Sequence, residues 1–562
     1  MCGIWALINL VKNKPDIAKY LADFWELQNR GPDNSCFETF PQAWVGFHRL
    51  AIMDTSFKSN QPFVLQEKDK TIVFVCNGEI YNFKHLISKY KLDIDGNSDC
   101  MTIPKLYSKY SDNLSEWYKL FDREIKGEFA FILLEFDHLK SLRNIFVGRD
   151  QIGIRPLYYH SPTPKSKQLI FTSEIKGARN FPDSIEEYPP GFITKLELNE
   201  FGALDRTQYN FNWIYNVKQI EISDSSATEE FLLSNIRNAI INAVRRRLDA
   251  DRPIAFLLSG GVDSSLVTAI GQKILGVPIK TFCCGMKGGT DLKYAKMVAD
   301  HIGSHHNEVY FTAEDGINAL EEVIYATETW DTTTVRASVG QFMVCKHIGT
   351  ETDCKVVLVG EGPDEVCSSY LFNWYAPSAE ALDLAAKEYV KNIHYYDCRR
   401  GDRCISYWGL EGRVPLLDPE VIEAYWKLPA EWRQPKYKGV EKWWLRKAFD
   451  GLDLLPDEVL WRKKEAFSDG VSSKEKSWYE IIQKECEKNI TTSMMDQAKV
   501  EWLHQTPPSK EAYHFRKIFT DKFGINRHDI LPKYWLPKWN KDGEEVNEYM
   551  DPSARVLDIY DN

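Results

Sequence analysis

The chain has 562 residues, of which 43% are hydrophobic and 27% are charged, and its formal net charge is −11. This length exceeds what one hydrophobic core supports and predicts two or three domains. The acidic balance argues against a general nucleic-acid surface, and no apolar run reaches the roughly 18–20 residues that span a bilayer.

Cysteine usage and the first residues indicate the compartment. Twelve cysteines are scattered through the chain without a C-x-x-C pair, which is typical of free thiols in a reducing compartment. Residues 4–11 are apolar but lack a preceding basic region and a following cleavage site, which argues against a signal peptide. We therefore expect a cytosolic protein that acts on neither nucleic acid nor membranes.

The first residue that could carry chemistry is Cys2. In isolation, a cysteine here is most often a small buried hydrophobe. If Met1 is removed, Cys2 carries its own base, because an α-amino group with a pKa of ~7.7–8.0 can take the proton of a thiol with a pKa of ~8.5. The residue alone leaves both interpretations open.

Four further stretches favour the nucleophile. They read N-R-G-P-D at 29–33, F-H-R-L-A-I at 47–52, N-G-E-I-Y-N at 77–82, and G-R-D at 148–150 with G-I-R-P-L at 153–157. With the Cys2 start they resemble the glutaminase domain of class II glutamine amidotransferases, which implies the αββα fold of N-terminal nucleophile hydrolases.

That resemblance implies roles for particular residues. Cys2 becomes the nucleophile, while the side chain of Asn77 and the backbone N–H of Gly78 stabilise the oxyanion. Arg49 and Asp99, with Glu79, become the glutamine-binding residues. Asn77-Gly78 between the β-rich runs 71–76 and 80–83 also fits a type I′ hairpin, and the two interpretations are compatible.

The domain boundaries are predicted from loop-forming residues and from changes in composition. The glutaminase half closes after the run 169–176 and the P-P-G loop signal at 189–191. We predict a glutaminase domain at 1–205, a polar linker at 206–227, a second domain at 228–540 and a C-terminal tail at 541–562.

The second domain alternates helical segments with apolar runs at 254–258, 279–284 and 356–359, which predicts an α/β fold with a parallel sheet. Ligands in such folds bind at the carboxyl ends of the strands. There S-G-G-V-D-S-S at 259–265 precedes a predicted helix at 266–275, so a glycine turn and a helix N-terminus form an anion site, with Asp263 suited to Mg²⁺. An ordinary glycine turn capped by an aspartate fits the spacing equally well.

A resemblance to known proteins favours the anion site over the ordinary glycine turn. The 259–265 segment resembles the pyrophosphate loop of N-type ATP pyrophosphatases. T-T-V-R-A-S at 333–338, G-E-G-P-D-E at 360–365, E-G-R-V-P-L-L-D at 411–418 and W-R-K-K-E-A-F-S-D-G at 461–470 extend the likeness to glutamine-hydrolysing asparagine synthetases, over nearly the whole chain. It implies glutamine, aspartate and ATP as substrates, Mg²⁺ as cofactor, a β-aspartyl-AMP intermediate, ammonia transfer inside the protein, and the homodimer that relatives often form.

The family's synthetase roles carry over onto matching positions. The implied ATP-binding residues are Leu258, Ser259, Gly260, Gly261, Asp263, Ser264, Cys284, Gly360 and Glu361. Asp263 and Asp364 are the implied metal ligands. Glu361 acts on the incoming ammonia, and Lys464 stabilises charge on the pyrophosphate side. The candidates for aspartate or phosphate contacts are Thr333, Thr334 and Arg336.

Four positions depart from the family pattern. Thr290 precedes Asp291 where the family often has proline, and the other three lie in or near the segment that commonly reads S-G-E-G-S-D-E. Val359 and Pro363 remove two hydroxyls, and Ser369 stands where glycine is more usual, so we expect altered ATP binding or rate. One alternative is a β-lactam synthetase-like ligase, which needs no glutaminase and is disfavoured by the intact Cys2 and Arg49. The other is a non-catalytic or glutaminase-only homologue with an altered synthetase site, which the retained charged residues disfavour.

Overall fold

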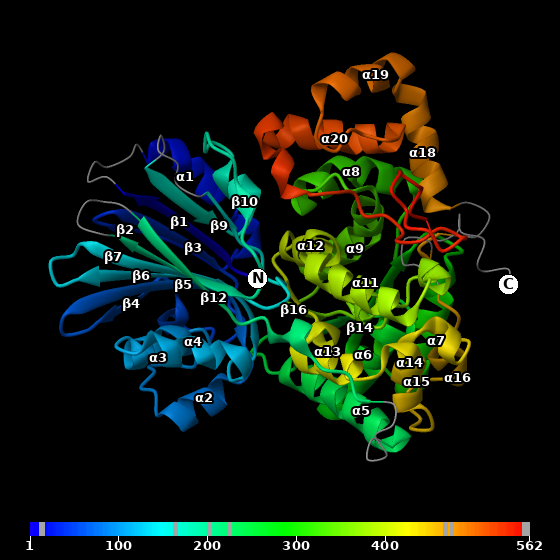
Figure 1. The fold of residues 1–562 in the computed structure, drawn as a ribbon, viewed down its shortest axis with the longest axis horizontal. Helices are drawn as coiled ribbons and strands as arrows, with labels where there is room; N and C mark the ends of the chain where they lie inside the picture. The colour runs from blue at the N-terminus through cyan, green and yellow to red at the C-terminus, as the bar shows by residue number, and fades with distance from the viewer. Residues whose placement is uncertain are drawn as a thin grey trace.

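The structure is a computed structural model that describes residues 1–10, 17–160, 167–198, 204–221, 228–464, 470–472 and 477–553. Two halves lie side by side, a strand-rich N-terminal half and a helix-rich C-terminal half (Figure 1). The N-terminus lies at their junction, where the Met1 ammonium donates to the carbonyl of Leu410 at 2.9 Å. The start of the chain is therefore held against the C-terminal half.

Two antiparallel six-stranded sheets form the N-terminal half. The first has the order β10 (Glu186–Glu187), β8 (Tyr158–Tyr159), β9 (Gln168–Thr172), β1 (Gly3–Asn9), β3 (Ala43–Arg49), β2 (Asn34–Phe40). The second has the order β12 (Leu204–Asn210), β11 (Phe192–Leu198), β7 (Leu142–Arg149), β6 (Gly127–Asp137), β5 (Lys70–Ile80), β4 (Phe63–Gln66).

Side-chain alternation explains how the two sheets pack. In β1, Ile4 and Ile8 join a buried cluster with Val73 and Ile132 of the second sheet. Trp5, the neighbour of Ile4, points the opposite way and packs against helix α1. Successive side chains in a strand face opposite sides, so one strand fills both the space between the sheets and the space under the helix.

Helices cover the outer face of each sheet. The helices of this half are α1 (Ala18–Trp25), α2 (Phe83–Tyr90), α3 (Thr102–Tyr110) and α4 (Leu114–Arg123). Trp117 of α4 is fully buried against Phe131 and Phe146 of the second sheet. The layers therefore run helix, sheet, sheet, helix, and the predicted αββα fold is confirmed.

A five-stranded parallel sheet organises the C-terminal half. Its order is β15 (His305–Tyr310), β14 (Lys280–Gly285), β13 (Ile254–Leu257), β16 (Val356–Leu358), β17 (Glu411–Arg413). Three of these strands match the apolar runs noted in the sequence, and the predicted parallel α/β fold is confirmed. The two outer strands were not predicted, since β15 is largely exposed and β17 is only three residues long.

Helices surround this sheet and extend beyond it (Figure 1). They are α5 (Glu229–Arg246), α6 (Val262–Leu275), α7 (Thr290–Ile302), α8 (Ala313–Thr327), α9 (Thr332–Glu351), α10 (Pro363–Val366), α11 (Ala379–Asn392), α12 (Asp397–Ser406), α13 (Pro419–Trp426), α14 (Ala430–Arg433), α15 (Trp443–Phe449), α16 (Asp457–Leu460), α18 (Trp478–Asn489), α19 (Thr492–Glu501) and α20 (Lys510–Phe523). Within the described ranges, no helix combines the length and the apolar character needed to cross a membrane.

The predicted linker at 206–227 begins inside β12, the outermost strand of the second sheet. The ordered N-terminal sheet thus extends to Asn210, and a short 3-10 turn follows at Trp213–Asn216. The last part of that linker, 222–227, and the end of the predicted tail, 554–562, lie outside the described residues.

Candidate active sites

Cys2 precedes the first strand and lies at the junction of the halves. Its thiol contacts the carbonyl of Leu50 at 3.7 Å, and the Arg30 guanidinium donates to its backbone carbonyl at 2.9 Å. With Met1 in place, burial raises the pKa of the Cys2 thiol to about 11 and lowers that of the Met1 amine to about 5. The nitrogen of Cys2 is part of a peptide bond while Met1 is present. The Cys2 α-amine can therefore act as a base only after Met1 has been removed.

Asn77 and Gly78 lie inside the continuous strand β5, opposite Ala130 and Phe129 of β6. The hairpin interpretation is therefore wrong. Gly78 is required by close packing instead, because a Cβ there would lie 2.2 Å from the Glu128 carbonyl oxygen. Both polar atoms of the Asn77 side chain are buried and lack a hydrogen-bond partner among the described residues.

Such a group is costly unless something satisfies it. An amide held in a sheet with neither end bonded is suited to a substrate that brings its own donor and acceptor. This is the strongest structural indication of a ligand site in the N-terminal half.

The other predicted glutamine-binding residues are also buried here. Arg49 donates to the Ser56 carbonyl at 2.6 Å and to Asn60 Oδ1 at 2.7 Å, which holds the loop after β3. Asp99 accepts from the Ile80 N–H at 2.6 Å, and burial raises its pKa to about 6. Glu79 lies 3.3 Å from Arg413 of the C-terminal half.

In the C-terminal half, the loop after β13 has the geometry of an anion site. Gly260 has a φ of +76°, and a Cβ there would lie 2.5 Å from the Tyr294 side chain, so only glycine fits. Helix α6 begins at Val262, earlier than predicted, which puts Asp263 and Ser264 in its first turn. An α-helix leaves the N–H groups of its first turn without intrahelical partners, so this end of α6 is suited to binding an anion.

A cavity of about 170 Å³ opens at this loop. It is lined by eight of the predicted residues: Ser259, Gly261, Asp263, Ser264, Gly360, Glu361, Asp364 and Lys464. They come from the ends of β13 and β16 and from the segment after α16, so the carboxyl edge of the sheet assembles them as expected.

Two carboxylates and two lysines form the charged centre of the cavity. Lys442 Nζ lies 2.5 Å from Asp263 and 2.6 Å from Asp364, and Lys464 Nζ lies 2.5 Å from Asp364. Burial alone would raise the pKa of Asp364, but the two lysines hold it well below its usual range.

These residues fit a magnesium ion. Asp263 Oδ1 is buried without a hydrogen-bond partner among the described residues, and carboxylate oxygens are the ligands Mg²⁺ prefers. The described residues contain no group of three or more potential metal ligands. Mg²⁺ commonly takes one or two carboxylates from the protein and completes its shell with phosphates and water.

Glu361 faces the same cavity. Its Oε1 accepts from Gln341 at 3.0 Å and lies 3.3 Å from Arg400, while Oε2 is buried without a hydrogen-bond partner in the described chain. Burial raises the pKa of this carboxyl, and Arg400 opposes that rise. A raised pKa is what a carboxylate needs to accept a proton near neutral pH.

Six other predicted residues are not in the described lining of the cavity. Leu258, Gly260 and Cys284 do not line it, and the Cys284 thiol donates to the Gly340 carbonyl at 3.0 Å. Thr333 and Thr334 belong to the first turn of α9, where Thr334 is bonded to Asp331, the N-terminal cap.

Arg336 is already paired. Its guanidinium binds Glu511 at 2.6 Å and Asp551 at 2.9 Å, and its side chain is only 3% exposed. In this arrangement it ties α9 to α20 and the end of the described chain. Contact with a substrate would require exchange of these partners.

The departures from the family pattern have local explanations. Pro363 is the first residue of α10, where a missing N–H costs nothing, and Gly362 before it has a φ of +105°. The Ser369 hydroxyl donates to Asp364 at 2.5 Å. Val359 follows β16 and lines the cavity. Residues 465–469 of the last motif lie outside the described residues.

Both halves of the chain match models of known protein families. The family model described as glutamine amidotransferase domain matches residues 1–222, and that described as asparagine synthase matches residues 235–388 and 375–522. An asparagine synthetase [glutamine-hydrolyzing] of Gallus gallus is 38% identical over 582 aligned residues, covering 100% of this chain and 99% of the relative. The Homo sapiens protein of the same name is 37% identical, with the same coverage of both chains.

The chain belongs to the glutamine-hydrolysing asparagine synthetase family. The likeness spans both halves of the chain, as the sequence motifs predicted.

Several polar residues of the two candidate sites were not identified from the sequence. Lys442, Arg400 and Gln341 line the cavity, and Arg30 contacts Cys2. Arg30 lay in a recognised motif and could have been found there. Lys442 gave no sequence signal, and its left-handed backbone, with a φ of +58°, is visible only in the structure.

Proposed function

We propose that this chain synthesises L-asparagine from L-aspartate, ATP and L-glutamine, releasing AMP, pyrophosphate and glutamate. The observation that carries the proposal is the pairing of two sites in one chain of this family. One is the Asn77 amide in β5, which has no hydrogen-bond partner in the described part of the chain. The other is the cavity with its carboxylates and lysines at the edge of the parallel sheet.

Glutamine hydrolysis is assigned to the N-terminal half. Once Met1 is removed, the α-amine of Cys2 takes the thiol proton, and the thiolate attacks the glutamine side-chain amide. The Asn77 amide and the Gly78 N–H stabilise the oxyanion, ammonia leaves, and water hydrolyses the thioester to glutamate. Arg49 receives the α-carboxylate and Asp99 the α-amino group, with Glu79 beside them.

Aspartate activation is assigned to the C-terminal cavity. The β-carboxylate of aspartate attacks the α-phosphorus of ATP, pyrophosphate leaves, and β-aspartyl-AMP remains. Ser259, Gly261 and Ser264 hold phosphate oxygens through the loop and helix N-terminus. When bound, Mg²⁺ neutralises charge on the pyrophosphate, and Asp263 and Asp364 would hold it, while Lys464 assists.

Ammonia then displaces AMP, and Glu361 takes the proton that the new amide nitrogen loses. Because an acyl-adenylate hydrolyses in water, ammonia must arrive inside the protein. The position of Cys2 at the junction of the halves supports an internal route. The twelve free cysteines support a cytosolic location.

The test is product analysis on the mature protein with ATP, Mg²⁺ and aspartate, supplied with either glutamine or ammonium. Wild type is expected to make asparagine, AMP and pyrophosphate from both donors, and Cys2→Ala from ammonium alone. Cys36→Ala, at another thiol of the same half, is the matched control and keeps both activities. Wild-type protein that makes glutamate but neither asparagine nor AMP would contradict the proposal and favour the glutaminase-only alternative.

A further inference from the structure

Helix α12 (Asp397–Ser406) lies at the junction of the two halves (Figure 1). Nine of its ten residues are buried, although it carries three arginines and two aspartates. Charges are costly to bury unless they are closely paired. The partners of these charges therefore indicate what the helix does.

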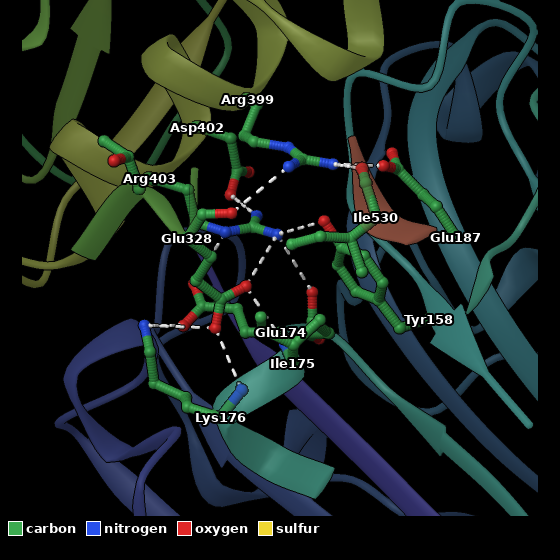
Figure 2. A network of polar contacts seen from close by, with 12 residues as sticks. Tyr158, Glu174, Ile175, Lys176, Glu187, Glu328, Arg399, Asp402, Arg403 and Ile530 are labelled. Atoms are coloured by element: carbon green, nitrogen blue, oxygen red, sulfur yellow. Dashed lines mark hydrogen bonds and ion pairs between the residues drawn. The ribbon is translucent and has the colours of Figure 1, made fainter. Parts of the chain in front are cut away.

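One face of α12 binds the N-terminal half. Arg399 pairs with Glu187 at 2.5 Å, and Arg403 lies 3.5 Å from Glu174. Figure 2 shows Arg399, Asp402 and Arg403 projecting from the helix into a network with Glu174, Glu187 and Tyr158. Residues spaced i, i+3 and i+4 share a helix face, so these three act together as one clamp.

Asp402 links α12 to Cys2, the proposed glutaminase nucleophile, through Arg30. Its carboxylate accepts two bonds from the Arg30 guanidinium, at 2.7 and 3.2 Å, and the Ser406 hydroxyl accepts a third at 3.0 Å. The Nε of the same Arg30 donates to the backbone carbonyl of Cys2 at 2.9 Å. The chain of contacts from α12 to Cys2 thus contains a single intermediate side chain.

The other face of α12 holds the synthetase cavity. Arg400 lies 3.3 Å from Glu361 Oε1 and donates to Gln341 at 3.0 Å. Gly401 packs so closely that a Cβ there would lie 2.2 Å from Glu361 Oε2. Arg400 and Asp402 are two residues apart and therefore face nearly opposite sides of the helix.

We propose that α12 couples the two sites, with Asp402 as the positioning residue that fixes Cys2, through Arg30, relative to the helix that holds Glu361. The inference rests on the proposed function. A fixed spacing keeps the point of ammonia release aligned with the point of its use. Without Asp402, Arg30 keeps its 2.5 Å contact with Glu174 of the N-terminal half and its bond to Ser406, but its charged partner on α12 is lost, so Cys2 can shift relative to the helix. The Arg399 and Arg403 contacts keep α12 and the cavity in place.

The test is the ratio of glutamate to asparagine formed from glutamine, together with the ammonium-dependent rate. Asp402→Asn is expected to raise the ratio about fivefold while the ammonium-dependent kcat stays within about twofold, because a charge-assisted link is lost on one face only. Asp402→Glu, which keeps the carboxylate, is expected to recover part of the coupling. A purely structural role would lower both rates in parallel and leave the ratio unchanged.

Two further variants keep the test decisive. Ser406→Ala weakens the same Arg30 link without removing a charge, and it is expected to raise the ratio about twofold. Glu423→Gln breaks an exposed contact between the halves, with Arg123, and is expected to keep the wild-type ratio. Wild-type ratios in both Asp402→Asn and Ser406→Ala would overturn the inference. Wild-type protein that makes no asparagine would instead overturn the proposed function.

Discussion

The two sites differ in how their polar groups are held in the absence of substrate. In the N-terminal half, Asn77 lies in a continuous strand and its buried amide has no partner in the described chain. In the C-terminal cavity, Asp263 and Asp364 share Lys442 and largely neutralise it. A substrate can therefore bond the Asn77 amide without displacing a protein partner, whereas a ligand of Lys442 must replace one of its two carboxylates.

This difference predicts different consequences of substitution. Removing a side chain from the first site deletes one interaction with the transition state and leaves its neighbours as they were. Removing a charge from the second leaves buried partners uncompensated, which disturbs the whole cavity. The predictions below test this contrast, from the largest expected effect to the smallest.

Asp364→Asn should have the largest effect. Lys442 and Lys464 lose a shared carboxylate, and a proposed metal ligand is lost, so asparagine formation from either donor should fall by about 10³-fold or more. Glutamine hydrolysis should stay within about twofold, because the N-terminal site is separate. Separate assays of pyrophosphate and glutamate check this. Asp450→Asn, at an aspartate paired with Lys447 in the same half, is the control.

Asn77→Ala should lower the kcat of glutamine hydrolysis by about 10²–10³-fold, the usual cost of one oxyanion donor. The ammonium-dependent rate should be unchanged. Since the amide has no partner in the described protein, no internal hydrogen bond is lost. Asn144→Ala, at a half-buried amide bonded to Glu135, serves as control and should keep the glutaminase rate. Equal losses in both variants would refute the oxyanion role.

The pH dependence of glutamine use should be steep on the acid side. Burial raises the pKa of Asp99 to about 6, so its carboxylate is charged above pH 6 and protonates as the pH falls through it. The protonated form loses its attraction for the α-amino group, and kcat/KM for glutamine should fall about tenfold per pH unit below 6. Asp99→Asn should have a lower kcat/KM and should lose the extra fall that wild type shows below pH 6, keeping only the fall that comes from protonation of the Cys2 amine. A flat wild-type profile down to pH 5 would count against this role.

Pro363→Ser, which restores the residue common in the family, should have the smallest effect. Pro363 is the first residue of α10. A backbone N–H at this position has no acceptor within the helix, so proline loses no helical hydrogen bond there. The KM for ATP and the ammonium-dependent kcat should therefore change by less than about threefold. A change of tenfold or more would show that the lost hydroxyl contacts ATP, as the sequence comparison suggested.

Much of the molecule could be predicted from local patterns. The apolar runs at 254–258, 279–284 and 356–359 gave three strands of the parallel sheet, because buried parallel strands read as continuous apolar segments. The Gly260 turn also follows from neighbours in sequence, and the helix after it was predicted, although it begins at Val262 rather than at 266. Eight predicted residues meet in one cavity, since strand ends in a parallel sheet share an edge.

Local patterns failed where a neighbouring strand decided the conformation. Asn77-Gly78 carries the sequence signal of a hairpin, yet pairing with β6 along the whole of β5 keeps it extended. The glycine is needed because the Glu128 carbonyl approaches it, and nothing in the segment itself reveals that contact.

The sequence by itself predicted the two fold classes and the order of the two halves, through the resemblance of its motifs to a known family and, for the parallel sheet, through its apolar runs. Only the tertiary structure decided which charges meet. Lys442 lies between Asp263 and Asp364, and Arg30 pairs with Asp402, 372 positions later in the chain. Such pairs form only when the two halves and the loops of the sheet come together, and no local pattern encodes that distance.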